Sequence, residues 1–286
     1  MRSASSSSGI GDTVRQLVRD KWPNLAVRFA SALILGPLVL AIVYLGPRYF
    51  DALVTVFAAV LAWEWSRLCG HGKISQGGYL VIAVVVAALV AGALREYVIA
   101  GWIVAAGVMA AIVTAGRSAG REPLWHGLGI LYTALPCLSL VWLREHPALG
   151  REIMFWLLFV VWATDIGAYA AGRSIGGPKL APKVSPNKTW AGLVGGIVSA
   201  TLVSLLVGLF LLPWNPATLV WSGAALAVWS QVGDLFESSV KRHFGVKDSS
   251  SLIPGHGGLL DRADGVLAGG LGVGLLVWMG EASPWL

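Results

Sequence analysis

The sequence predicts an all-α fold: a polytopic integral membrane bundle of about nine transmembrane helices with a cytoplasmic N-terminus. Of its 286 residues, 56% are hydrophobic and only 13% are charged, and the mean hydropathy is +0.71. A soluble domain carries roughly 25% charged residues, so most of this chain's surface must face lipid. The apolar runs are long and unbroken, without the alternation of a membrane β-barrel. The net charge of +6 is therefore attributed to cytoplasmic loops rather than to nucleic-acid binding.

The first 28 residues are predicted to form a disordered, partly amphipathic cytoplasmic tail. They contain the serine run 5–8, followed by Arg15, Arg19 and Lys21. This polar pattern differs from the apolar core of a cleaved signal peptide. Residues 29–286 are predicted to form one transmembrane domain, because no linker divides them.

Each spanning helix is predicted from a run of about 20 mainly apolar residues. These runs must be helices, because an open strand in lipid leaves backbone groups without hydrogen bonds. In chain order the predicted helices are 29–47, 50–68, 78–95, 97–115, 124–143, 153–172, 190–212, 217–236 and 264–281.

The basic residues between these helices predict the orientation. If the N-terminus is cytoplasmic, 17 of the 21 Lys and Arg residues lie on the cytoplasmic side. The exceptions follow the first, third and fifth helices and are Arg48, Arg95, Arg144 and Arg151. Since cytoplasmic loops are enriched in Lys and Arg, this bias predicts a cytoplasmic N-terminus and an external C-terminus. The odd number of helices also disfavours two inverted repeats, a common transporter plan.

Two long cytoplasmic loops, 173–189 and 237–263, differ in composition from the rest of the chain. Both are rich in Lys, Arg, Ser, Thr and Gly. These residues supply positive charge, hydroxyl donors and closely approaching backbone amides, which together suit phosphate groups. Ordinary cytoplasmic charge combined with turn residues is the alternative explanation.

Acidic residues at the cytoplasmic ends of the helices suggest a cation site. Ionised groups at such depths are costly and tend to face a polar cavity or a partner. Carboxylates beside basic loops favour Mg²⁺ held against phosphate oxygens. Salt bridges such as Asp165–Arg173 or Asp261–Arg242 are the alternative. The acids are Asp165, Asp234, Asp261 and Asp264, and Glu237 follows Asp234 at a spacing of three.

Other residues have open or structural interpretations. Glu64, at the inner end of the second helix, either lines the site or pairs with Arg67. Glycine pairs spaced by four residues are interpreted as helix-packing contacts, which allow a homodimer without requiring one. These pairs are Gly192/Gly196, Gly265/Gly269 and Gly270/Gly274.

The stretch from Ser238 to Asp264 resembles the signature of the phosphatidate cytidylyltransferases, also called CDP-diacylglycerol synthases. That signature places Ser before Lys-Arg, then Lys-Asp, His-Gly-Gly and Asp-Arg-x-Asp. The matching residues here are Ser238, Lys241, Arg242, Lys247, Asp248, His256, Gly257, Gly258, Asp261, Arg262 and Asp264. The segments 185–189, 165–169 and 233–234 also resemble family positions, so the resemblance is sharp over about 165–265. The chain departs from the family pattern at Ala191, Ala263 and Gly265.

The resemblance implies transfer of a cytidylyl group from CTP to phosphatidate, giving CDP-diacylglycerol and pyrophosphate. It implies a bacterial inner-membrane enzyme with its active site on the cytoplasmic face. The lipid phosphate is the nucleophile and is largely ionised at pH 7, so no strong general base is required. A CTP-using lipid kinase and a transporter are the alternatives. A kinase would release CDP rather than pyrophosphate.

The resemblance also implies a role for each motif residue. Asp234 and Asp261 are expected to be the first Mg²⁺ ligands, with Asp264 and Asp165 next, and a second cation is allowed. The groups expected to neutralise phosphates are Lys241, Arg242, Lys247 and Arg262, with His256 as a donor or as part of the turn that contains Gly257 and Gly258. Further nucleotide contacts are expected from Ser185, Asn187, Lys188, Thr189 and Asp248.

Overall fold

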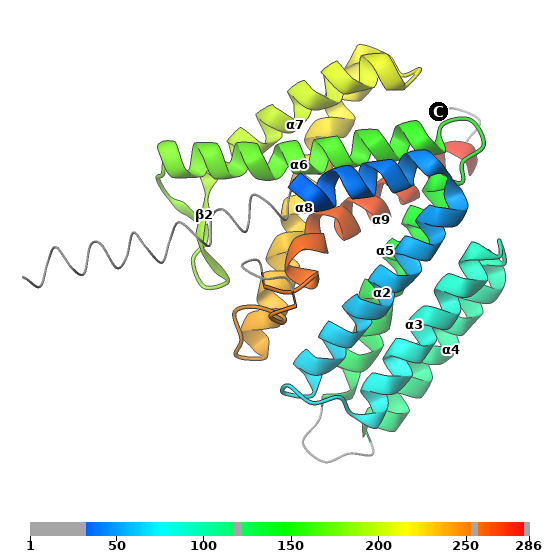
Figure 1. Cartoon of the computed structure of the whole chain (residues 1–286). Helices are drawn as coiled ribbons and strands as arrows, with labels where there is room; N and C mark the ends of the chain where they lie inside the picture. Colours follow the sequence, from blue (N-terminus) through cyan, green and yellow to red (C-terminus); the bar gives the residue numbers. More distant parts are fainter. Residues whose placement is uncertain (1–32, 117–121, 253–256, 283–286) are drawn as a thin grey trace, which may run out of the picture.

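The computed structural model describes residues 33–116, 122–252 and 257–282. The predicted tail 1–28 therefore lies outside the described residues. Each predicted transmembrane segment corresponds to one described helix, apart from a few residues at some segment ends (Figure 1). The helices are Leu33–Leu45, α2 (Pro47–Cys69), α3 (Gln76–Ala93), α4 (Tyr97–Gly116), α5 (Pro123–Arg144), α6 (Gly150–Ser174), α7 (Trp190–Leu211), α8 (Pro216–His243) and α9 (Leu260–Ala282).

Seven of the described helices are long and apolar enough to cross a membrane, namely α2 to α7 and α9. The helix Leu33–Leu45 is apolar but shorter. The helix α8 has 28 residues but falls outside this group. Its last three turns carry acidic and basic side chains, which lower its hydropathy. The chain is thus a membrane helical bundle, and seven of its described helices meet this criterion, where about nine spans were predicted.

The loop 173–189 contains strands that the sequence did not predict. Two short strands, β1 (Lys179–Ala181) and β2 (Ser185–Thr189), pair antiparallel there, with Lys179 opposite Thr189. The strands are too short, and too interrupted by proline, to produce an alternating sequence pattern. Figure 1 shows this hairpin projecting from the connection between α6 and α7.

The second long loop is shorter than predicted, because both neighbouring helices extend into it. Helix α8 continues through Lys241 and Arg242 to His243, and α9 begins at Leu260 rather than at 264. The hydrophobic run ends at 236, but Glu, Lys and Arg are good helix formers. Basic residues in the last turn of α8 also interact favourably with the helix dipole. As a result, four candidate charged residues predicted in the loop lie on helices instead: Lys241, Arg242, Asp261 and Arg262.

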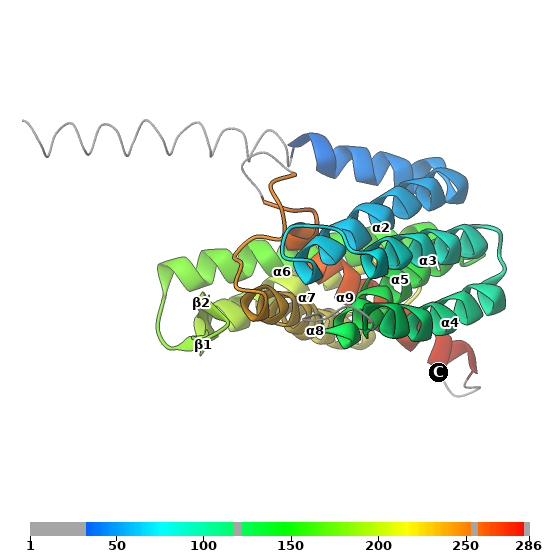
Figure 2. The ribbon, with the colours of Figure 1, turned by 90° about the horizontal axis from the view of Figure 1, so that it is seen from below.

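Helix α9 packs between two groups of helices. Contacts join α2, α3, α4 and α5 on one side and α6, α7 and α8 on the other, and α9 contacts α5 and α8 (Figures 1 and 2). A Cβ at Gly233 would lie 2.4 Å from the Ala268 Cβ and 3.0 Å from the Asp264 carbonyl oxygen. This glycine therefore lets α8 approach α9 at the level of the acidic residues. The predicted packing role of the Gly192/Gly196 pair is confirmed, since Gly196 packs on the Thr164 carbonyl of α6.

Candidate active site

Three carboxylates from α8 and α9 form a cluster where these helices meet. Asp234 and Glu237 lie one turn apart on α8, and Asp264 lies on the facing side of α9. Each offers an oxygen, and these oxygens all lie within 4.8 Å of one another. We call Asp234, Glu237 and Asp264 the acidic cluster. Three negative charges at this spacing repel one another by kilocalories per mole unless cations compensate them.

Two lysines border the acidic cluster, one at Asp234 and the other at Glu237. The Lys188 Nζ, from β2, lies 2.6 Å from Asp234 Oδ2 and donates to the Gln231 side chain at 2.9 Å. The buried Lys241 Nζ lies 2.7 Å from Glu237 Oε2 and 2.5 Å from Asp261 Oδ1. The hairpin thus brings Lys188 into contact with α8. Helix α8 itself supplies Lys241, which lies between Glu237 and Asp261.

Asp261 has protein partners on both of its carboxylate oxygens. Its Oδ1 contacts Lys241, and its Oδ2 accepts from the backbone N–H of Gly258 at 2.7 Å and of Ser249 at 3.0 Å. The Ser249 hydroxyl is also 3.0 Å from the same oxygen. Asp261 therefore fastens the segment before α9 to Lys241. The predicted first-choice pair Asp234 and Asp261 is not one cluster here, and Glu237 stands beside Asp234 instead.

Glu64 of α2 is fully buried and contacts the segment that precedes α9. Its carboxylate accepts hydrogen bonds from the hydroxyls of Ser249 and Ser250 and from the backbone N–H groups of Leu259 and Leu260. The expected alternative pairing with Arg67 is absent from the ion pairs of the described residues. Arg67 instead stacks on Trp63 and donates to the Gly72 carbonyl. Glu64 thus belongs to the surroundings of the site.

A tyrosine that the sequence did not indicate also borders the acidic cluster. The ring of Tyr132, on α5, packs between Trp65 and Phe236, with centroids 5.1 and 5.3 Å away. Its hydroxyl is buried, has no hydrogen-bond partner among the described residues, and interacts electrostatically with Asp234, Glu237 and Asp264. The proximity of Tyr132 to the acidic cluster depends on helix packing, and nothing in the local sequence of α5 indicates it.

Two further motif residues, Asp165 and Arg242, are not members of the acidic cluster. Asp165 of α6 interacts electrostatically with Asp234, Lys188 and Arg262. Arg242 is exposed and donates to the carbonyls of Val184 and Val246, so it joins the hairpin to the end of α8.

The other nucleotide-contact candidates are spread over the hairpin and the loop after α8. Thr189 caps α7 by accepting from the Gly192 N–H at 3.0 Å, while Asn187 is exposed and Ser185 is half-buried on β2. Lys247 and Asp248 are exposed. His256 lies outside the described residues. The structure does not place these residues against the acidic cluster, and their roles remain predictions.

Neither of the internal salt bridges considered as alternatives occurs among the described residues. Arg173 donates to the Tyr169 hydroxyl rather than to Asp165, and Asp261 pairs with Lys241 rather than with Arg242. Lysines do neutralise part of the acidic charge, through Lys188 and Lys241. Asp264 makes no ion pair within the described part of the chain, where its Oδ1 accepts only from the adjacent Gly265 N–H.

The acidic cluster fits a hard divalent cation. It offers carboxylate oxygens from two helices, and Glu237 Oε1 is buried with no hydrogen-bond partner in the described ranges. Mg²⁺ prefers oxygen ligands and typically takes one or two carboxylates, completing its shell with water and phosphate. The donor set therefore suits Mg²⁺.

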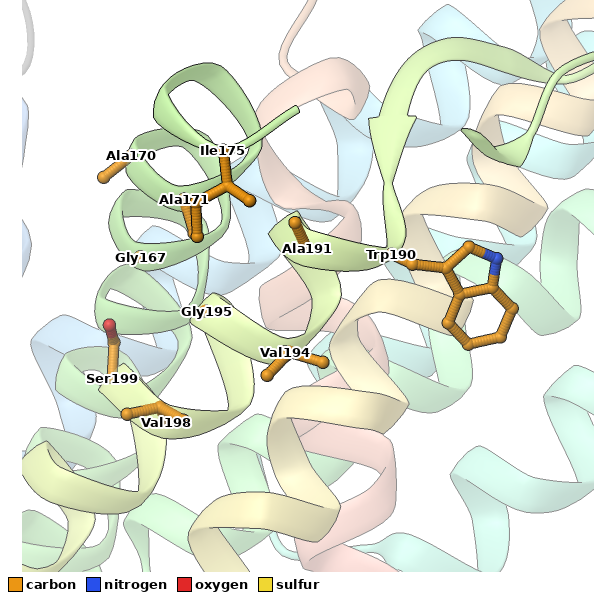
Figure 3. A pocket seen from close by; sticks show the side chains of 10 residues that line it. All are labelled: Gly167, Ala170, Ala171, Ile175, Trp190, Ala191, Val194, Gly195, Val198 and Ser199. Carbon is orange, nitrogen blue, oxygen red and sulfur yellow. The ribbon is translucent and has the colours of Figure 1, made fainter. Parts of the chain in front are cut away.

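An apolar groove lies between α6 and α7, apart from the acidic cluster. Figure 3 shows its floor of small residues, with Gly167 and Ala171 from α6 and Gly195 and Ser199 from α7. None of its lining residues is ionisable. The groove therefore offers none of the groups needed for phosphate chemistry, which lie instead at the ends of α8 and α9 and on the hairpin.

Comparison with known proteins agrees with this geometry. Residues 26–279 match the cytidylyltransferase family. The chain belongs to this family. Its relatives include the following three proteins, each named phosphatidate cytidylyltransferase. The relative from Brucella suis biovar 1 (strain 1330) is 39% identical over 255 residues, which are 86% of this chain and 90% of the relative.

The other two relatives differ in how much of the chain they match. The Pseudomonas aeruginosa protein is 37% identical over 273 residues, covering 91% of this chain and 98% of the relative. The Bacillus subtilis (strain 168) protein is 41% identical over 141 residues, covering 49% and 52%. As a cytidylyltransferase, the chain is a nucleotidyltransferase, and the predicted family resemblance is confirmed.

Proposed function

We propose that this chain transfers a cytidylyl group from CTP to phosphatidate, giving CDP-diacylglycerol and pyrophosphate. The observation that carries the proposal is the acidic cluster, bordered by Lys188 and Lys241, in a membrane helical bundle of the cytidylyltransferase family. The names of the relatives support phosphatidate as the lipid substrate. A membrane-embedded bundle also lets a lipid substrate keep its acyl chains in the bilayer.

The reaction needs little proton chemistry. An oxygen of the phosphatidate phosphate forms a bond to the α-phosphorus of CTP. The bond from that phosphorus to the bridging oxygen breaks, and its electron pair leaves with pyrophosphate. The lipid phosphate is largely ionised at pH 7, since its second pKa is about 6. Catalysis therefore depends on positioning two polyanions and stabilising negative charge.

We assign the charged groups to these two tasks. Asp234, Glu237 and Asp264 would hold Mg²⁺, and Asp165 adds negative charge beside them. Bound there, Mg²⁺ would supply Lewis-acid stabilisation of phosphate oxygens. Lys188 is a phosphate ligand that its present contact with Asp234 holds at the edge of the site.

The basic residues outside the acidic cluster complete the phosphate site. These residues are Arg242, Lys247 and Arg262, together with hydroxyl and amide groups of the hairpin. Asp261 and Lys241 support the site by holding the start of α9 against α8. We place this active site on the cytoplasmic face of a bacterial inner membrane, because the long basic loops lie at that end.

The function is tested by measuring pyrophosphate release from the purified full chain in detergent. CTP, Mg²⁺ and phosphatidate are supplied together and then omitted one at a time. Release that requires all three, with a cytidine-containing lipid product, supports the proposal. Release of CDP with a lipid alcohol, or no release from monodisperse protein, contradicts it.

A further inference from the structure

Glu64 is an acid whose four hydrogen bonds join distant parts of the chain. Its side chain is fully buried in α2, and its partners are 185 to 196 residues away in sequence. Oε1 accepts from the Ser250 hydroxyl at 2.5 Å and the Leu259 N–H at 2.9 Å. Oε2 accepts from the Ser249 hydroxyl at 3.1 Å and the Leu260 N–H at 2.7 Å. A buried carboxylate is costly unless it is hydrogen-bonded, and here both oxygens are occupied.

These bonds fix the beginning of α9. The first N–H groups of a helix have no partner within the helix, and a carboxylate at that end also interacts favourably with the helix dipole. Leu259 and Leu260 are the residues at this boundary. Glu64 therefore caps α9 from a different helix, and it sets the position and rotation of the first turn of α9.

The same contacts reach the acidic residues of α9. The Ser249 hydroxyl, which binds Glu64, also lies 3.0 Å from Asp261 Oδ2. Asp264 follows Asp261 by three residues and faces Asp234 and Glu237 of α8. A displacement of the first turn of α9 would thus change the separation of the carboxylates in the acidic cluster.

The residue at position 258 shows how closely these groups are packed. A Cβ at Gly258 would lie 1.9 Å from the Ser249 Oγ and 2.7 Å from Glu64 Oε1. Only glycine lets the carboxylate and the serine approach the backbone in this way. The contact between α2 and the start of α9 therefore requires both the carboxylate of Glu64 and the absence of a side chain at Gly258.

We propose that Glu64 is a positioning residue, which holds Asp264 at the separation from Asp234 and Glu237 that a divalent cation requires. Glu64 acts through α9 and is not itself a metal ligand, because protein donors occupy both of its oxygens. This inference rests on the cation site proposed above. Residues that orient metal ligands typically contribute 10- to 100-fold to metal affinity.

The test measures Mn²⁺ binding to the purified full chain by electron paramagnetic resonance, without substrates. Glu64→Gln turns an amide NH₂ toward two of the four donors. Glu64→Asp keeps the charge but shortens the reach by one methylene. Both variants are expected to bind Mn²⁺ about tenfold more weakly than the wild type. The matched control is Glu96→Gln, at an exposed residue in the turn between α3 and α4, which is expected to bind Mn²⁺ normally.

Activity provides a second readout that a general structural role would not give. In Glu64→Gln the Mg²⁺ concentration for half-maximal turnover should rise about tenfold, while kcat at saturating Mg²⁺ stays within about threefold of the wild type. Recovery at high Mg²⁺ separates a misplaced metal site from a damaged fold. A loss of kcat that excess Mg²⁺ does not restore would overturn the proposal.

Three further outcomes decide between the possibilities. Wild-type Mn²⁺ affinity in Glu64→Asp would show that charge rather than position matters, and would overturn the proposal. If the Glu64 variants do not yield monodisperse protein, Ser250→Ala decides: it removes one of the four bonds, and unchanged Mn²⁺ affinity counts against the proposal. Wild-type Mn²⁺ affinity in Asp264→Asn would instead refute the cation site itself.

Discussion

At the scale of single residues, two acids one turn apart on α9 have opposite surroundings. Asp261 is compensated by Lys241 and by the donors of Ser249 and Gly258. Asp264 faces two other carboxylates instead. At 4.8 Å, one pair of like charges repels by about 3 kcal/mol in an effective dielectric constant of 20. Neutralising Asp264 should relieve repulsion, whereas neutralising Asp261 should break a buried ion pair.

We therefore predict thermal shifts of opposite sign for the two Asn variants. In EDTA, Asp264→Asn should raise the unfolding midpoint by about 2 to 5 °C, and Asp261→Asn should lower it by about 5 °C or more. Turnover should fall about 100-fold or more in both. The midpoints are measured by size-exclusion chromatography after heating in detergent. An unfolding midpoint of Asp264→Asn below that of the wild type would show that the three carboxylates do not repel one another in the folded protein.

A second residue-scale prediction concerns the buried hydroxyl of Tyr132. Removing an unpaired buried hydroxyl costs nothing in hydrogen bonds and avoids its desolvation penalty of about 1 to 3 kcal/mol. Tyr132→Phe should therefore keep or raise the unfolding midpoint. Tyr44→Phe, at an exposed tyrosine far from Tyr132 in the sequence, serves as the control and should leave the midpoint unchanged. A midpoint that falls in Tyr132→Phe would mean that the hydroxyl has a partner in the folded protein.

Sequence reasoning found the site residues whose types are unusual for their surroundings. Asp234 and Asp264 stand out because charged side chains are rare near the ends of apolar helices. Glu237 was visible only through its spacing from Asp234. The sequence leaves Glu64 open between lining the site and pairing with Arg67, and it does not indicate Tyr132 at all, because the partners of both come from helices far away in sequence. No local pattern encodes such contacts.

At the scale of elements, the break between the helix Leu33–Leu45 and α2 shows how a side chain replaces a missing backbone donor. Pro47 begins α2 and has no N–H, so the Val43 carbonyl four residues earlier lacks the donor that a continuous helix would supply. The buried Arg144 of α5 donates to this carbonyl from Nε at 2.9 Å and from Nη2 at 2.7 Å. Arg144 thus connects α5 to the end of the helix Leu33–Leu45.

This contact predicts a specific loss on substitution. Arg144→Met keeps much of the apolar volume but removes both donors, and should destabilise the fold by about 1 to 3 kcal/mol. The control is Arg151→Met, since Arg151 is exposed and contacts its neighbour Glu152 and the exposed ring of Tyr44. Thermal midpoints in detergent compare the two variants. Equal midpoints would show that the Val43 carbonyl does not depend on Arg144.

The helices were predictable and the hairpin was not, for a physical reason. A helix in lipid must satisfy its own backbone, so about 20 apolar residues are sufficient to predict it. Proline adds detail, because Pro47, Pro123 and Pro216 stand in the first turns of α2, α5 and α8. The strands β1 and β2 lie outside this constraint. Long-range contacts such as Lys188 with Asp234 help to position them.

At the scale of the whole molecule, the acidic cluster lies where the two groups of helices meet. Helix α9 packs on α5 and α8, and Glu64 extends the connection to α2. The hairpin approaches from the other group through Lys188. Because all these contacts are at one end of the helices, the side of the membrane at which that end lies decides whether CTP from the cytoplasm can reach the site.

The basic-residue bias predicts that this end is cytoplasmic, and single cysteines can test it in intact cells. Both native cysteines, Cys69 and Cys137, are buried, so a membrane-impermeant maleimide should label the wild type weakly. Lys179→Cys, on the hairpin, should react only after the cells are permeabilised. Glu96→Cys, in the turn between α3 and α4, should react before permeabilisation, because the predicted topology places it outside. Labelling of Lys179→Cys alone in intact cells would reverse the orientation and put the acidic cluster on the side without CTP.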